Sequence, residues 1–193
     1  MAIASPRQSE LEKFAQALVQ SVTKIFHEKG EIRFSKEPLV VRKNIIEYDG
    51  RMRADGMEKF NNPTFVSTVN YYANAKDMEK KNALGALIVY IEQSYVVPLL
   101  RLLKYPPVDD EDEEAMKDGC GTLCNIIAGC FKSEIAAMGH IDLEMSHFSN
   151  YRNSASNGVA FCYKEYDKYE ISIFIENVKR LVIEMTMGTV PRK

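Results

Sequence analysis

The stretch DGCGTLCNIIAG, residues 118–129, decides the fold of this chain because it predicts an amphipathic helix of unusual composition. On a helix that turns about 100° per residue, side chains three and four positions apart share a face. One such stripe is apolar: Met116, Cys120, Leu123, Ile127 and Cys130. A second stripe is small and polar: Asp118, Thr122, Asn125, Gly129 and Lys132.

The small polar stripe is not what a merely solvated helix face would carry. Such a face usually holds Glu, Lys and Arg, which are good helix formers. Here the segment contains three glycines, Gly119, Gly121 and Gly129, and each costs about 1 kcal/mol relative to Ala. This composition indicates that another backbone or a docked partner comes close to the helix, without saying which.

Composition sets wide limits on function. The chain has 193 residues, of which 46% are hydrophobic and 27% charged, and its net charge is −2. These values are typical of a globular domain and give no reason to expect nucleic acid or an anionic membrane as a partner. No apolar run approaches the roughly 20 residues that span a bilayer. We expect one domain over residues 1–193, in the cytoplasm, with its four cysteines reduced.

The first half of the chain is expected to mix helix and strand. Residues 6–29 predict a helix that ends at Gly30, and Phe65–Ala73 predict a strand. The remaining expectations are strands at Glu31–Ser35 and Leu39–Tyr48, and a long helix from Asp77 through Leu103, kinked or split at Pro98.

The second half is expected to be a helix followed by sheet. The helix begins after an acidic run, Asp109–Glu114, continues to about Met138 and ends at Gly139. Alternation predicts a strand over His140–His147, and Val178–Met187 fit either a strand or a short helix. A hairpin is predicted from Val159–Glu165 and Tyr169–Glu176 around residues 166–168. The sum is an α+β domain with three main helices and an antiparallel sheet.

Two groups of metal-binding residue types are explained more simply by structure. Cys120, Cys124 and Cys130 lie near one helix face, but no second ligand pair has zinc-finger spacing, so buried thiols acting as small hydrophobes are favoured. A second group lies within eight residues: His140, Asp142, Glu144 and His147. The wet face of a strand accounts for the first three of these equally well, and no metal site is predicted.

Asn125 is the residue of the polar stripe with a possible chemical role. A lone Asn inside a helix is unfavourable, and its simplest reading is a surface residue or a buried hydrogen-bonding one. Its carboxamide is donor and acceptor at once, with no useful pKa. It therefore cannot act as a general base, but it can hold a water in line for attack on a phosphoryl group, a reaction that depends mainly on positioning.

The helix, with its Asn-Ile-Ile-Ala-Gly core from Asn125 to Gly129, resembles the signature helix of the CheC/CheX/FliY chemotaxis phosphatases. That family's pattern is (Asp/Ser)-x-x-x-Glu-x-x-Asn, followed by a more distant Pro. Asp118 and Asn125 match it in identity and spacing. The resemblance, which spans roughly Phe14 to Ile175, implies an antiparallel sheet with two long helices packed on one face, plus an N-terminal helix.

The resemblance also implies a function and partners. Members of the family remove the phosphoryl group from the aspartate of a phosphorylated response regulator. The Asn orients the attacking water and the Glu engages a lysine of the receiver domain. The protein itself would need no cofactor, since the receiver supplies Mg²⁺. Some members form dimers through the sheet, so a homodimer is expected here.

The sequence departs from the family pattern at two positions. Thr122 occupies the place of the Glu, and Phe148 lies where the Pro is expected. Asp118 and Thr122 are the candidate residues for docking the receiver. Glu114, on the same stripe, is a second acid that can take the place of the missing Glu. Glu79 and Asn82 show the Glu-x-x-Asn gap and form an alternative second site. Two hypotheses stay open: a divergent phosphatase, or a non-catalytic adaptor or dimeric scaffold that keeps the docking face.

Overall fold

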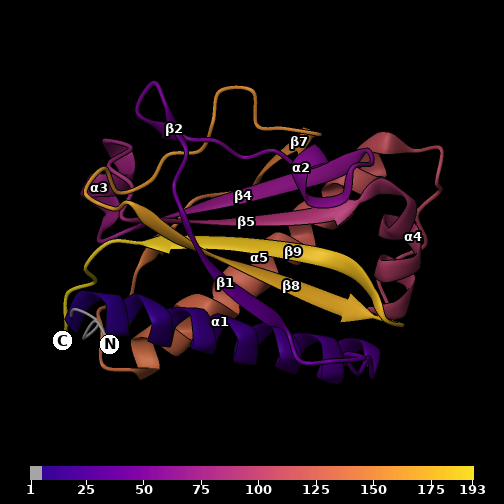
Figure 1. Cartoon of the computed structure of the whole chain (residues 1–193), viewed down its shortest axis with the longest axis horizontal. Coiled ribbons are helices and arrows are strands. Elements are labelled where there is room, and N and C mark those ends of the chain that lie inside the picture. Colours follow the sequence, from indigo (N-terminus) through magenta and orange to yellow (C-terminus); the bar gives the residue numbers. More distant parts are fainter. Residues whose placement is uncertain (1–5) are drawn as a thin grey trace.

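A seven-stranded antiparallel sheet forms the centre of the molecule in the computed structural model, which describes residues 6–193 (Figure 1). The strand order is β1-β8-β9-β5-β4-β6, and β7 also pairs with β4. The strands of this sheet are β1 (Leu39–Asn44), β4 (Thr64–Tyr72), β5 (Gly85–Glu92), β6 (Glu144–Met145), β7 (Ser149–Arg152), β8 (Asp167–Ile175) and β9 (Val178–Met187). Two further strands, β2 (Glu47–Tyr48) and β3 (Arg51–Met52), form a separate small hairpin.

Two of the five helices of residues 6–193 are long. The helices are α1 (Pro6–Gly30), α2 (Met57–Phe60), α3 (Ala75–Glu79), α4 (Gln93–Leu102) and α5 (Glu113–Ala137). The predicted C-terminal end of α5 is confirmed, and the helix starts at Glu113, within the acidic run and not after it. Asp112 accepts a hydrogen bond from the Ala115 N–H at 3.0 Å, and Gly139 adopts φ +90° beyond the last turn. Within the described part of the chain, no helix has both the length and the apolarity needed to cross a bilayer.

The long helices α1 and α5 pack together and on one face of the sheet, where they build the main core. Figure 1 shows α1 running beside β8 and α5 crossing behind the strands. The predicted fold class, an antiparallel sheet with two long helices on one face, is therefore confirmed. The predicted N-terminal helix is α1, which serves as one of the two long helices, while the second long helix expected over Asp77–Leu103 is not formed.

The other face of the sheet carries a smaller core of its own. Met52 and Ala54, from the segment around the β2–β3 hairpin, pack there against sheet residues such as Ile88. Val159 and Phe161, from the long connection before β8, complete this cover. Both faces of the sheet are therefore covered, which leaves its edges as the exposed parts.

The predicted helix from Asp77 through Leu103 is wrong. Residues 75–79 form the short α3, residues 93–102 form α4, and between them Gly85–Glu92 is the strand β5. β5 lies between β4 and β9, and its side chains enter the core on each face of the sheet, so nearly all of them are buried. A strand covered on both faces is a continuous apolar run without alternation, and its sequence is easily taken for a buried helix.

The predicted strands before β1 and after α5 also need correction. Residues 31–35 are irregular, and Leu39–Tyr48 is divided between β1 and β2. Of the predicted strand 140–147, only Glu144–Met145 forms a strand, and His140 makes an isolated bridge to Arg192. His140 is buried beside α1 instead of facing water.

The hairpin is formed by β8 and β9 rather than by 159–165 and 169–176. Its turn is at Glu176-Asn177, where both residues have positive φ, 52° and 62°. This is the backbone that two-residue hairpin loops require. Val178–Met187 is accordingly a strand, which resolves the alternative left open by its sequence.

A buried ionic cluster joins α2 to the second face of the sheet. Glu184, on β9, is fully buried and accepts hydrogen bonds from Lys59 and from the hydroxyl of Tyr90, each at 2.6 Å. It also forms an ion pair with Lys168 at 2.6 Å. Lys59 also bonds Glu170 at 2.6 Å. Burial acts to lower the pKa of Lys59, but the two carboxylates outweigh it and raise that pKa. Glu184 and Glu170 together thus balance the charges of the two desolvated lysines, and Glu184 contacts both.

We predict that Glu184→Ala lowers the free energy of unfolding by about 3–5 kcal/mol, because it leaves buried cations without their partner. Urea denaturation measures this change. Lys43→Ala is the matched control, since its ammonium is half exposed and bonds only Glu170, and should cost less than about 1 kcal/mol. Equal effects of the two substitutions would contradict this assignment.

Candidate functional site

Helix α5 is fixed to the central strands by its apolar stripe. Cys124, Ile127 and Phe131 are fully buried against the sheet. The Tyr71 hydroxyl, on β4, donates a hydrogen bond to the Ala128 carbonyl at 3.0 Å. The opposite stripe of α5 therefore faces away from the core.

Three candidate residues stand in a row on this outward stripe. Asp118, Thr122 and Asn125 are all exposed. None of their side chains makes a hydrogen bond or an ion pair with the part of the chain that the structure describes. Thr122 and Asn125 are neighbours at i and i+3, and Asp118 lies about 10 Å along the axis from Asn125. The helix thus presents an unengaged acid, hydroxyl and carboxamide together.

The glycines of α5 have different neighbours. A side chain at Gly119 would overlap Leu100 of α4, and one at Gly121 would overlap the ring of Phe148. These two glycines are explained by close packing within the chain. A Cβ at Gly129 would meet no atom within 4 Å. Gly129 therefore lies on the outward stripe with no partner in the described chain to account for it.

Residues just before and within β7 hold the N-terminal half of α5 in place. The Asn150 amide donates to the Lys117 carbonyl at 2.9 Å and accepts from the Ser67 hydroxyl at 2.7 Å. The ring of Phe148 lies against Gly121. The sequence analysis did not predict these contacts. The signal that could have found them is Phe148 itself, which stands where the resemblance leads one to expect Pro.

The acids near the start of α5 are unequally engaged. Lys117 bonds Glu113 at 2.9 Å and Glu114 at 2.8 Å, and Arg152 bonds Glu113 at 2.7 Å. The hydrogen bond from Lys117 leads the effects that lower the pKa of Glu113. Because Glu114 already pairs with Lys117, Asp118 is the acid on the outward stripe that is unpaired within the described chain.

The alternative second site is not on a long helix. Glu79 is the last residue of α3, and Asn82 follows in a turn. Both are exposed, and the Asn82 amide donates to Asp77 at 3.3 Å. The structure therefore does not place Glu79 and Asn82 on one helix face as it does Asp118 and Asn125.

The thiols of Cys120 and Cys124 are buried, as expected of small hydrophobes, and burial raises the pKa of both. His140 is also buried, with its Nδ1 3.0 Å from the Val190 carbonyl oxygen. Among the described residues, no group of three or more His, Cys, Asp or Glu side chains is arranged to hold a metal ion.

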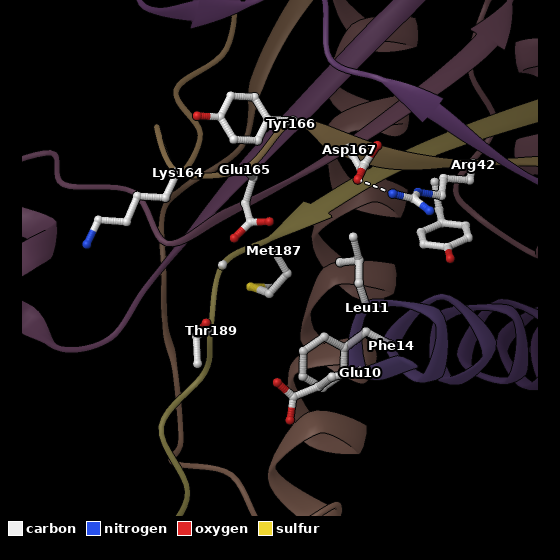
Figure 2. Close-up of a pocket in the computed structure, with 12 residues that line it drawn as sticks. Glu10, Leu11, Phe14, Arg42, Lys164, Glu165, Tyr166, Asp167, Met187 and Thr189 are labelled. Atoms are coloured by element: carbon white, nitrogen blue, oxygen red, sulfur yellow. Dashed lines mark hydrogen bonds and ion pairs between the residues drawn. The ribbon is translucent and has the colours of Figure 1, made fainter. Parts of the chain in front are cut away.

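A pocket of about 290 Å³ opens elsewhere, between the start of α1 and the segment that leads into β8 (Figure 2). Its floor includes Leu11, Phe14 and Met187, and the Arg42–Asp167 ion pair closes one side. The candidate residues of α5 line neither this pocket nor the hollows beside α1 and α3. They lie on an open helix surface, which suits a protein partner better than a small molecule.

We predict opposite effects of two alanine substitutions in α5. Gly129→Ala should raise the free energy of unfolding by up to about 1 kcal/mol, because alanine favours the helix and its methyl group meets open space. Gly121→Ala should lower it by about 1–3 kcal/mol, since Phe148 must move. Urea unfolding curves test both, and a destabilising Gly129→Ala would show that the chain itself needs this glycine.

Comparisons with known proteins find the fold but no close sequence relative. No family model and no curated protein matches the sequence. Solved structures do match. The match to FliY from Thermotoga maritima covers 98% of this chain and 93% of FliY, with a TM-score of 0.57 and 11% sequence identity.

Two further matches have similar scores. A putative chemotaxis protein from Desulfovibrio vulgaris Hildenborough gives a TM-score of 0.56 at 13% identity, over 91% of this chain and 97% of the other. CheX from Borrelia burgdorferi, solved as a CheX–CheY–BeF₃–Mg²⁺ complex, gives 0.55 at 12%, over 91% and 98%. The chain therefore has the fold of the CheX, CheC-like and FliY chemotaxis proteins, with a highly divergent sequence.

Proposed function

We propose that this chain, acting as a single CheX-like domain over residues 1–193, docks on a phosphorylated response-regulator receiver domain. Asn125 then places the water that removes the phosphoryl group from the receiver's aspartate. The shared fold supports this proposal, as does the similar CheX, whose structure contains CheY. We expect the protein in the cytoplasm, with neither nucleic acid nor membrane among its partners.

The observation that carries the proposal is an unengaged carboxamide on an open helix surface. Asn125 is exposed, its carboxamide bonds no described residue, and it lines none of the pockets described above. An amide without a pocket cannot assemble a reaction centre alone. It can complete one that a partner brings, by hydrogen bonding to a water in line with the partner's phosphoryl group. Such a partner supplies its own Mg²⁺, so this chain needs no cofactor.

Gly129 supports a close approach at the same stripe. It lies one turn beyond Asn125, and the space above it is empty. A glycine that costs about 1 kcal/mol, with no contact inside the described chain to require it, fits a surface against which another protein packs closely. Asp118, one turn before Thr122, then supplies the negative charge for a basic group of the receiver.

Thr122 favours the second candidate function, a non-catalytic adaptor that binds the receiver. A hydroxyl at the motif's Glu position forms no ion pair with a receiver lysine. If Asp118 does not replace that contact, the docking face remains while catalysis is lost. The two candidates share a binding surface and differ in whether Asn125 affects a rate.

The test is the dephosphorylation rate of phosphorylated receiver domains from the same organism. We predict that the wild-type protein accelerates the reaction for one receiver, and that Asn125→Ala removes about 100-fold of the acceleration, because the water is no longer held in line. Ser133→Ala is the matched control, being another exposed polar residue of α5, two turns further along, and should retain the rate.

Binding measurements separate the candidates. Saturable binding to the BeF₃-activated receiver without acceleration would establish the adaptor. Gly129→Ala should weaken that binding in either case, although it stabilises the fold. Thr122→Glu should raise the phosphatase rate by restoring the acid of the motif. If neither Thr122→Glu nor Asn125→Ala changes the rate, the water-positioning mechanism is wrong.

We further propose that the protein forms a homodimer through the edge strand β1. Among the described strands, β1 pairs with β8 alone, and all six of its residues are exposed. Its first three residues are apolar: Leu39, Val40 and Val41. An exposed apolar edge is a ready template for pairing with another strand. Since both faces of the sheet are covered, the edge is the part of the sheet left for association.

Sedimentation velocity tests this proposal. We predict a dimer that Val40→Lys combined with Val41→Lys converts to a monomer of unchanged secondary structure, because the charges repel across the paired edges. Val178→Lys, at an exposed valine that begins β9, should leave the dimer intact. A wild-type protein that stays monomeric at high concentration would overturn the dimer.

A further inference from the structure

Arg180 stands at an irregularity in the β8–β9 pairing. Ile173 pairs with Leu181, but the next residue of β8, Phe174, pairs with Lys179. Arg180 is therefore an extra residue in β9, a β-bulge. Bulges redirect a side chain out of the regular alternation of a strand and are frequent beside functional sites.

The redirected guanidinium lies on the ring of Tyr95. Its central carbon is 4.3 Å from the ring centroid. Tyr95 belongs to the first turn of α4 and is 6% exposed. Figure 1 shows α4 beside the end of the sheet where β8 meets β9. Two segments far apart in sequence thus bring a cation and a phenol together.

Both side chains carry a buried donor without an acceptor. Among the described residues, three buried side-chain polar atoms lack a hydrogen-bond partner, and two of them are the Tyr95 hydroxyl and the Arg180 Nε. Arg180 also makes no ion pair within the described chain. Each buried donor without an acceptor lowers the stability of the fold by about 1–3 kcal/mol. Buried polar groups are nearly always hydrogen-bonded, so an unpaired one indicates a partner that is missing from the isolated chain.

The nearest acidic group does not fill this place. Burial raises the pKa of Tyr95, and the positive charge of Arg180 acts to lower that pKa. The negative charge of Glu176 acts to raise it, so the Glu176 carboxylate lies close enough to affect the phenol. However, Glu176 is exposed in the β8–β9 turn and forms no ion pair with Arg180. Arg180 is half-buried, and only its Nε is both buried and unpartnered. An oxyanion would satisfy this donor and also pair with the guanidinium charge, whereas a water would satisfy the donor alone.

We propose that Arg180 and Tyr95 form a binding site for a small oxyanion, a carboxylate or a phosphate group, at the junction of α4 and β9. The guanidinium supplies the charge and the Nε–H, and the phenol supplies a second donor from α4. This site shares no residue with the outward stripe of α5 and does not depend on the phosphatase or adaptor function.

Titration of the full chain with inorganic phosphate and with acetate, at constant ionic strength, tests the proposal by calorimetry. We expect saturable 1:1 binding of at least one probe, and the preferred probe identifies a phosphate or a carboxylate ligand. Arg180→Gln should weaken this binding about tenfold or more, and Tyr95→Phe several-fold, since each removes a donor. Glu176→Gln should preserve or strengthen it by removing a nearby negative charge.

Lys179→Gln is the matched control, because it removes one positive charge next to Arg180 from a side chain that lies over Phe60 instead. It should bind the probe like the wild type. Arg180→Lys, which keeps the charge but not the Nε donor, should bind weakly while remaining folded by circular dichroism. Absence of saturable binding of either probe to the wild type, or equal binding by Arg180→Gln, would overturn the site.

Discussion

The packing of α5 on the central strands is the constraint on which the rest of this structure depends. Tyr71 bonds the α5 backbone, and the buried Cys124 thiol lies 3.5 Å from the Ser67 carbonyl oxygen, so β4 fixes the rotation of the helix about its axis. The same rotation points Asn125 outward. Leu100 and Phe148 fit against Gly119 and Gly121 on either side. The core thereby determines which residues a partner can reach.

Periodic segments of the sequence predicted their structure well, and continuous apolar ones did not. α1 and α5 carry repeats of three and four with Gly at or just past their ends, so the sequence alone predicts both. The sequence of β5 predicts helix instead, because burial on both faces removes the alternation that marks a strand. The β8–β9 turn was missed because Glu176-Asn177 lacks the glycine that usually marks positive φ.

The sequence predicts the arrangement of candidate residues within one helix, but not their contacts with other elements. Helical spacing is enough to place Asp118, Thr122 and Asn125 in a row, since all three belong to α5. It does not reveal that Phe148, a residue from the connection before β7, occupies the space above Gly121, because that contact depends on the path of the chain. Arg180 and Tyr95 likewise meet only through the β9 bulge and the placement of α4. Contacts between elements require the fold.

The central claim is that the outward stripe of α5 is the surface that meets a receiver domain. Amide hydrogen exchange of the protein with and without a BeF₃-activated receiver tests it most directly. The account predicts protection concentrated in residues 118–132 and in the flanking segment that contains Phe148. Protection centred on the pocket between α1 and β8, or on the β2–β3 side of the sheet, with none on α5, would contradict it.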